Sequence, residues 1–240
     1  MKELKITTDS KLFALRVNVS KTDTLSVMLQ NTDCDIIALQ FCPDTKNILS
    51  ELLPQITRHL MIIGTGDNEI DKSLLPELIE KLDRPAIIAN LNDKTYKEII
   101  PSIIAGNHYV VLKTPIDINL AKELNILSVE MGLDKNKIIM NPDIGGLGYG
   151  FEYGYSIMEK IRLEGEKGDE YLKFPLLSEA STEALKTKEA KSNDFSKSWG
   201  DLQTRSKMIE LSACAGIISA GANIIIVNYP ENINILKGLV

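Results

Sequence analysis

A glycine-dense segment between an apolar run and a helical pattern is the part of the chain best suited to hold a ligand. The run Ile138–Met140 predicts a strand and leads directly into residues 141–150, Asn-Pro-Asp-Ile-Gly-Gly-Leu-Gly-Tyr-Gly. Glycines let a backbone approach a ligand closely, and the helix expected to begin near Tyr149 offers free N–H donors. Such turns are common, so the loop alone identifies no ligand. Its candidate cofactor-binding residues are Asn141, Asp143, Gly145, Gly146 and Gly148.

Eight apolar runs typical of strands alternate along the chain with helical patterns. The runs are Leu12–Val19, Cys34–Phe41, Leu60–Ile63, Ala86–Leu91, Tyr109–Leu112, Ile138–Met140, Tyr171–Leu177 and Asn223–Val227. This alternation, with short loops, predicts an α/β fold of the closed (β/α)8 TIM-barrel type; an open doubly wound sheet is the competing architecture. The 240 residues suit one such barrel and no Pro/Gly/Ser linker divides them, so we expect a single domain over residues 1–240.

Local signals bound the helices. Asp117 is a candidate N-cap and Gly132 a candidate C′ residue for a helix between them. Pro54 and Pro101 fall within helical patterns, so those helices are expected to be kinked or shortened. The connection from Ser178 to Leu202 is unusually long, and because strand-to-helix loops lie at the catalytic face of a barrel, we expect a loop or lid insertion at about 178–202.

The residues at the carboxyl ends of the strands surround the mouth of a parallel barrel, where barrel chemistry takes place. They are Asn18, Gln40, Thr65, Asn90, Asn92, Thr114, Asn141, Asp143, Ser178 and Asn228. Because this set is rich in neutral amides and poor in acids, bases and nucleophiles, it predicts a binding mouth with no catalytic residue and no metal site. We expect Asn90, Thr114 and Asn141 to bind a cofactor, and Asn18 and Asn92 to cap turns or helices.

The histidines and cysteines argue against a metal centre. His59 and His108 precede their strands and therefore belong to the opposite end of the barrel. Three cysteines without C-x-x-C spacing cannot supply the four thiolates of an ordinary iron–sulfur cluster. We expect Cys34 and Cys214 to be buried thiols and Cys42 to lie nearer the mouth in a structural role.

Bulk properties restrict the partners. The net charge of −6 argues against nucleic acid or an anionic membrane, since both need clustered Lys and Arg. No apolar run approaches the length of a membrane span, and the first residues form no signal peptide, so we expect a cytoplasmic protein.

Several motifs in a fixed order carry a family resemblance. They are Thr114–Leu127, Asn141–Gly150, Phe151–Leu163, Gly168–Glu170, Lys186–Lys191 and Trp199–Asp201. With them the chain resembles the small (delta) subunit of the corrinoid iron–sulfur protein, from the CO dehydrogenase/acetyl-CoA synthase system. The resemblance is dense from about Lys113 to Asp201 and faint before Asn90. It departs at Asn141, where the family has aspartate, and at the N-terminus, where the family has an additional segment.

This resemblance implies a TIM barrel that pairs with a large subunit holding a corrinoid and an iron–sulfur cluster. The mouth of the barrel faces the corrinoid, with the loop Asn141–Gly150 nearest to it. The pair receives a methyl group from a methyl-tetrahydropterin and passes it to acetyl-CoA synthase. The implied partners are the large subunit and the methyltransferase and acetyl-CoA synthase components.

Two other interpretations stay open. The chain could be an enzyme, a methyltransferase that binds a methyl-tetrahydropterin through Asn90, Asn141 and Asp143 and delivers its methyl group to a separate corrinoid protein. It could also be a structural subunit whose mouth binds nothing.

Overall fold

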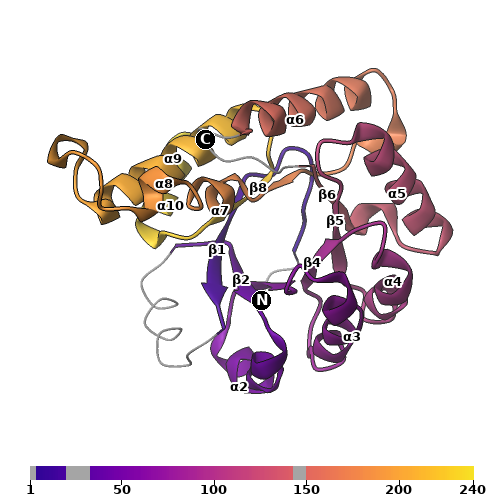
Figure 1. Ribbon diagram of the computed structural model, residues 1–240. Helices are drawn as coiled ribbons and strands as arrows, with labels where there is room; N and C mark the ends of the chain where they lie inside the picture. Colours follow the sequence, from indigo (N-terminus) through magenta and orange to yellow (C-terminus); the bar gives the residue numbers. More distant parts are fainter. Residues whose placement is uncertain (1–3, 20–32, 143–149) are drawn as a thin grey trace.

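The computed structural model describes residues 4–19, 33–142 and 150–240. Its eight parallel strands form a nearly closed barrel surrounded by helices (Figure 1). The strands are β1 (Leu12–Asn18), β2 (Ile36–Gln40), β3 (His59–Ile63), β4 (Ile87–Leu91), β5 (Tyr109–Lys113), β6 (Ile138–Asn141), β7 (Leu177–Ser178) and β8 (Ile224–Val227). Strands β6 and β7 meet through a parallel bridge between Met140 and Leu176. The predicted (β/α)8 TIM barrel is therefore confirmed.

Helices follow the strands as the local sequence predicts. They are α2 (Leu49–Leu52), α3 (Asn68–Ile79), α4 (Tyr96–Ala105), α5 (Ile118–Glu130), α6 (Phe151–Glu166), α7 (Ala180–Ala184), α8 (Lys188–Lys191), α9 (Leu202–Ser219) and α10 (Pro230–Lys237). Asp117 caps α5 by accepting the N–H groups of Asn119 and Leu120, each at 2.9 Å. Gly132, with φ of +98°, ends that helix in the left-handed region. No helix within the described ranges is long and apolar enough to span a bilayer.

Two proline-containing regions differ from each other. Pro54 lies in the 3-10 helix η2 (Leu53–Gln55), which follows the single turn of α2, so this helix is short as predicted. Pro101 lies inside α4, which continues to Ala105.

The predicted strand Tyr171–Leu177 is wrong over most of its length. Its first residues belong to the 3-10 helix η4 (Glu170–Leu172), and β7 covers only Leu177–Ser178. Asp169 caps η4 by accepting the N–H of Tyr171 at 3.1 Å, and Pro175 lacks the N–H that a strand donates. The apolar residues of the run are nonetheless buried, because the turn packs Leu172 and Phe174 into the core.

Strand periodicity divides the core into two parts. Side chains facing the helices form the outer core, and a smaller cluster fills the barrel itself. The inner cluster includes Ala14, Ala38, Val111, Ile139, Leu177 and Ile226. Two residues further along each strand come Arg16, Gln40, Lys113, Asn141, Glu179 and Asn228. With a period of two, these polar side chains share the inward direction, so the interior changes from apolar to polar at its carboxyl end.

Residues of the N-terminal segment close the opposite end of the barrel. Ile6 joins the inner cluster, and the hydroxyl of Tyr109 donates to the carbonyl of Leu4 at 2.7 Å. Both histidines lie at this end: His59 begins β3, and His108 precedes β5 and accepts the N–H of Ala86 on Nδ1 at 3.0 Å. Burial lowers the pKa of His108.

The long connection after β7 contains α7, α8 and the 3-10 helix η5 (Lys197–Trp199). Arg205 of α9 anchors it, since its guanidinium donates to the carbonyl oxygens of Glu189, Ser192 and Gly200. The lid role of this segment, like the single-domain organisation, stays a prediction.

Candidate functional site

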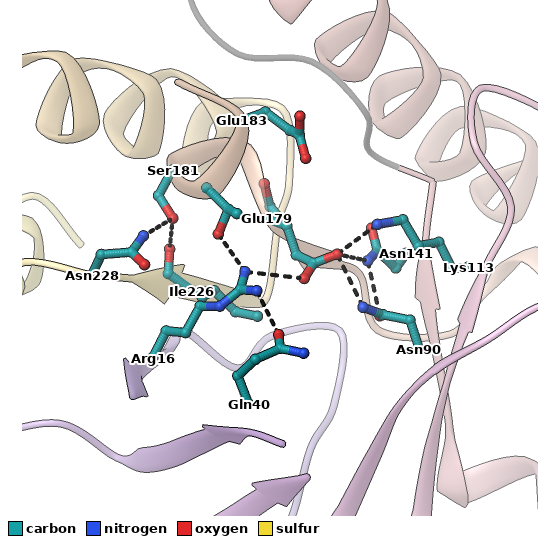
Figure 2. A network of polar contacts seen from close by, with 12 residues as sticks. Arg16, Gln40, Asn90, Lys113, Asn141, Glu179, Ser181, Glu183, Ile226 and Asn228 are labelled. Atoms are coloured by element: carbon teal, nitrogen blue, oxygen red, sulfur yellow. Dashed lines mark hydrogen bonds and ion pairs between the residues drawn. The ribbon is translucent and has the colours of Figure 1, made fainter. Parts of the chain in front are cut away.

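Glu179 is the centre of a polar network at the mouth of the barrel (Figure 2). Its side chain follows β7 and is buried, with the residue 5% exposed. One carboxylate oxygen, Oε2, accepts from Lys113 Nζ at 2.8 Å and from the side-chain amides of Asn90 and Asn141, each at 3.0 Å. Strands β4, β5 and β6 therefore each direct one donor at the acidic side chain that follows β7.

Arg16 of β1 extends the network to the other side of the opening. Its Nη1 lies 3.8 Å from Glu179 Oε1 and donates to Thr182 Oγ1 at 2.8 Å. Its Nη2 donates to the side-chain oxygen of Gln40, whose amide in turn donates to the carbonyl of Gly64. The network thus runs without a break from β6 through β7 and β1 to the end of β3.

Two cations, Lys113 and Arg16, surround the one buried acid of this network. Burial by itself raises the pKa of Glu179, but Lys113 and Arg16, together with the hydrogen bond from Asn141, lower that pKa below its ordinary value. The carboxylate is therefore held ionised. Because one of its oxygens already accepts three donors, it is suited to fixing its neighbours rather than to accepting a proton from a ligand.

A second buried carboxylate supports the neighbouring part of the mouth. Glu210 of α9 accepts the backbone N–H groups of Asn228 and Tyr229 at 2.7 and 3.0 Å. It also accepts the side-chain amides of Asn228 and Asn232, at 3.1 and 2.9 Å. Burial raises the pKa of Glu210, and these hydrogen bonds offset the rise only in part. Glu210 orients Asn228, which donates to Ser181 Oγ at 3.2 Å beside the Glu179 network.

Other predicted mouth residues serve local structure. Asn92 accepts the N–H of Lys94 on Oδ1 at 2.9 Å, which is a capping role, and Asn18 is exposed at the end of β1. Thr65 donates its hydroxyl to Asp71 at 2.8 Å, and Asp71 also accepts the N–H groups of Thr65 and Gly66. This buried aspartate therefore orders the loop between β3 and α3.

The predicted cofactor-binding residues are distributed unevenly around the opening. Asn90 and Asn141 converge, since the Asn141 amide also donates to Asn90 Oδ1 at 3.1 Å. Thr114 is buried beside them: its N–H donates to the carbonyl of Asn141 at 3.0 Å, and its hydroxyl has no partner within the described parts of the chain. Asp143, Gly145, Gly146 and Gly148 lie outside the described residues.

A cavity of about 480 Å³ opens above the network. Its polar lining includes Arg16, Gln40, Asn90, Lys113, Glu179, Glu183 and Lys186. Lys113 is the most accessible charged member of the network, with 31% of its side chain exposed, against 17% for Arg16 and 7% for Glu179. A ligand in the cavity therefore meets the ammonium group of Lys113 and the amide of Asn90, and both groups are held in position by their hydrogen bonds to the buried Glu179.

The prediction of an uncharged mouth is wrong. Arg16, Lys113 and Glu179 stand among the amides, and none of the three ends a predicted strand. The period-two pattern was the available signal, because Arg16 follows Ala14 and Lys113 follows Val111 on the inward face. Glu179 was harder to find, since the strand before it is only two residues long.

The cysteines are free thiols. Cys34 and Cys214 are buried, as predicted, and Cys42 is exposed, with its backbone N–H donated to Thr45 Oγ1 at 3.1 Å. No group of three or more His, Cys, Asp or Glu side chains suited to a metal ion occurs within residues 4–19, 33–142 and 150–240.

The fold and site together define a TIM-barrel protein with a polar, ion-paired mouth. The family model of the CO dehydrogenase/acetyl-CoA synthase delta subunit matches residues 10–236. The chain belongs to this family, which confirms the resemblance seen in the motifs.

Curated relatives of this chain are delta subunits of the acetyl-CoA decarbonylase/synthase complex. The acetyl-CoA decarbonylase/synthase complex subunit delta of Methanocaldococcus jannaschii is 29% identical over 81% of this chain and 48% of that protein. Subunit delta 1 of Methanosarcina thermophila is 28% identical over 92% of this chain and 52% of that protein. The chain thus spans about half the length of the curated relatives it matches.

Solved structures of similar fold are dihydropteroate synthases. The enzyme of Coxiella burnetii, in complex with pteroic acid, has a TM-score of 0.64 at 14% identity and covers 96% of this chain and 94% of that chain. A Yersinia pestis enzyme with a pterine–sulfa conjugate has a TM-score of 0.65 at 12% identity, covering 97% and 95%. At such identities the similarity shows the barrel fold alone.

Proposed function

We propose that this chain is the barrel subunit that shields a corrinoid, held by a partner subunit, during methyl transfer from a methyl-tetrahydropterin to acetyl-CoA synthase. The observation that carries the proposal is the convergence of Arg16, Gln40, Asn90, Lys113 and Glu179 on one opening, with the buried Asn141 donating to Glu179 from behind. Membership of the delta-subunit family supports the same role.

The side chains at the mouth suit the edge of a corrin ring. That edge carries amide groups, and the cavity presents amide and ammonium donors together with amide and carboxylate acceptors. Both histidines of the chain lie at the other end of the barrel, so neither offers an imidazole to a metal at the mouth. When bound, the corrinoid supplies the cobalt that carries the methyl group. The chain's own residues bind and orient the ring edge and exclude water.

The partners under this proposal are a corrinoid-bearing large subunit and the methyltransferase and acetyl-CoA synthase components, all in the cytoplasm. The names of the relatives, which are subunits of the acetyl-CoA decarbonylase/synthase complex, support it. In this role the chain carries no iron–sulfur cluster and performs no covalent step.

A second candidate function is that of a methyl-tetrahydropterin methyltransferase. The mouth cavity of about 480 Å³ favours it, because Asn90 and Lys113 line a space large enough for a bicyclic pterin. In this role Asn90 and Asn141, with Asp143, would hydrogen-bond the pterin. Against it stands Glu179, because the side-chain amides of Asn90 and Asn141 and the ammonium group of Lys113 already donate to its Oε2.

One purification with one titration separates these functions. The chain is tagged in its native cell and recovered with its partners, the absorption spectrum of the complex is recorded, and the isolated chain is titrated with methyl-tetrahydrofolate and methyl-tetrahydromethanopterin. The subunit role predicts a corrinoid spectrum on an accompanying protein and no saturable pterin binding. Saturable binding of either pterin would instead support the methyltransferase. Recovery without any corrinoid would contradict the proposal and leave a structural role.

A further inference from the structure

A second cavity, of about 360 Å³, lies at the amino end of the barrel. The turn before β1, helix α6 and the loops before β7 and β8 form its walls. Three cations, Lys11, Arg162 and Lys173, line it, and Asp9 and Glu166 are its two acidic residues. The cavity is therefore separate from the mouth and has an excess of positive charge.

The three cations have no ion-pair partner among the residues that the structure describes. Within the described parts of the chain, none of them lies within 4.0 Å of a carboxylate oxygen. Lys11 Nζ donates to the carbonyl of Ala222 at 2.7 Å, which leaves two of its N–H groups for a ligand. Arg162 donates through Nε and Nη2 to the carbonyl of Gly221 and through Nη2 to Asn223. Its Nη1 has no hydrogen-bond partner within residues 4–19, 33–142 and 150–240.

Backbone and asparagine contacts fix the two inner cations in place. Gly221 has φ of +103°, and a Cβ there would come within 3.0 Å of Arg162 Nε, so the guanidinium lies directly against a glycine. The amide of Asn223 donates to the carbonyls of Thr8 and Ser10 at 2.7 and 3.0 Å, which joins the turn before β1 to the same buried residue that accepts from Arg162. The cation positions are thus set before any ligand arrives.

Electrostatics favour an anion between these groups. Burial, and then the charge of Arg162, lower the pKa of Lys11. Burial lowers the pKa of Arg162, while the more distant charges of Asp9 and Glu166 oppose that effect only in part. Two half-buried cations that repel each other are both stabilised by a negative charge placed between them.

We propose that this cavity is a binding site for the phosphoryl group of a small molecule. Backbone carbonyls accept one N–H of Lys11 and part of the N–H groups of Arg162. The remaining donors of these two residues, together with Lys173, line the same cavity. A phosphoryl group has several acceptor oxygens and close to two negative charges, and so matches donors that converge from three directions. A carboxylate satisfies fewer of them.

Calorimetric titration of the whole chain tests this site. The probes are inorganic phosphate, phenyl phosphate and acetate, at constant ionic strength held with chloride. The variants are Lys11→Gln and Lys173→Gln, with Lys167→Gln as the matched control. Lys167 lies just beyond the same helix, is exposed, and pairs with Glu164 outside the cavity.

The wild type and Lys167→Gln are expected to bind inorganic phosphate and phenyl phosphate saturably, and acetate at least about tenfold more weakly. Lys11→Gln is expected to weaken phosphate binding by about tenfold, and exposed Lys173→Gln by a few-fold. Unfolding curves check that each variant is folded, and Lys173→Gln tests the site even where Lys11→Gln destabilises the fold. Absence of saturable phosphate binding, equal loss in Lys167→Gln, or acetate binding as tight as phosphate binding would overturn the proposal.

Discussion

Glu179 and Glu210 are both buried carboxylates near the carboxyl ends of the strands, yet they are neutralised by different means. Glu179 faces two cations, Lys113 and Arg16, whereas the hydrogen bonds to Glu210 come from backbone and side-chain amides. Their pKa values shift in opposite directions, downward for Glu179 and upward for Glu210. Cations compensate a buried charge more fully than amide dipoles do.

The contrast separates two tasks at the mouth. Glu179 organises charged and amide side chains that line the cavity, so its removal should change both stability and the surface a partner meets. Glu210 holds the loop between β8 and α10 in position.

Glu179→Gln is expected to lower the free energy of unfolding by about 2–3 kcal/mol, because Arg16 and Lys113 lose their shared counter-charge. The expected loss of stability is smaller than for a fully buried ion pair because 31% of the Lys113 side chain is exposed. Urea denaturation measures it. Glu183→Gln is the matched control, since this partly exposed acid pairs with exposed Lys186 and should cost less than about 0.5 kcal/mol. Equal effects in the two variants would show that Glu179 does not organise the network.

Glu210→Gln is expected to cost about 1–2 kcal/mol. Glu210 accepts four N–H groups, from Asn228, Tyr229 and Asn232. The side-chain nitrogen of glutamine would face some of these donors and leave them unpaired. The same denaturation series measures the loss. A neutral effect would mean that the loop after β8 is held by other contacts.

The pH dependence of stability should differ in sign between the two acids. The pKa of Glu179 is lowered in the folded state, so its contribution is complete above the ordinary carboxyl pKa and is lost as the pH falls through the folded value. The pKa of Glu210 is raised, so its contribution is complete at low pH and is lost as the pH rises through the folded value. Each group changes the slope by at most about 1.4 kcal/mol per pH unit.

The prediction is checked by measuring the free energy of unfolding of the wild type, Glu179→Gln and Glu210→Gln between about pH 3 and pH 8. This range extends to both sides of the ordinary glutamate pKa of about 4.3. Glu179→Gln should lose a decline toward acid, and Glu210→Gln should lose a decline toward neutral pH. Parallel profiles for the two variants would refute the contrast.

Thr114→Val is expected to have the smallest effect, between no change and a gain of about 1 kcal/mol. The buried hydroxyl of Thr114 has no partner in the described chain, and valine replaces it with a methyl group of similar shape. Thr182→Val serves as the comparison, because its hydroxyl accepts from Arg16 at 2.8 Å and its loss should destabilise by about 1 kcal/mol. A clear loss in Thr114→Val would reveal a bonding role for this hydroxyl.

The sequence predicted what local patterns determine. The Asp117 cap and the Gly132 terminus depend on residues within one helix, and the eight alternations identified the barrel. The charged mouth was missed because Arg16 lies within β1 and Lys113 is the last residue of β5, one place before the Thr114 taken as the strand-end residue; only the inward direction of the two side chains reveals their role. Glu179 comes directly after Ser178, the residue that ends β7 and that was predicted to line the mouth, so it fell one residue beyond the predicted set. Such non-local pairings as Asn141 with Glu179 have no signal in one sequence.

Under the proposed function, the corrinoid-bearing partner binds over the mouth of the barrel. The most direct test of this claim is the affinity of the corrinoid-bearing protein recovered with the chain for two charge-reversed variants, Lys186→Glu at the exposed rim of the mouth cavity and Lys167→Glu beyond α6. We expect Lys186→Glu to weaken binding at least about fivefold and Lys167→Glu to leave it unchanged. Equal affinities for the two variants, or a loss confined to Lys167→Glu, would contradict the claim.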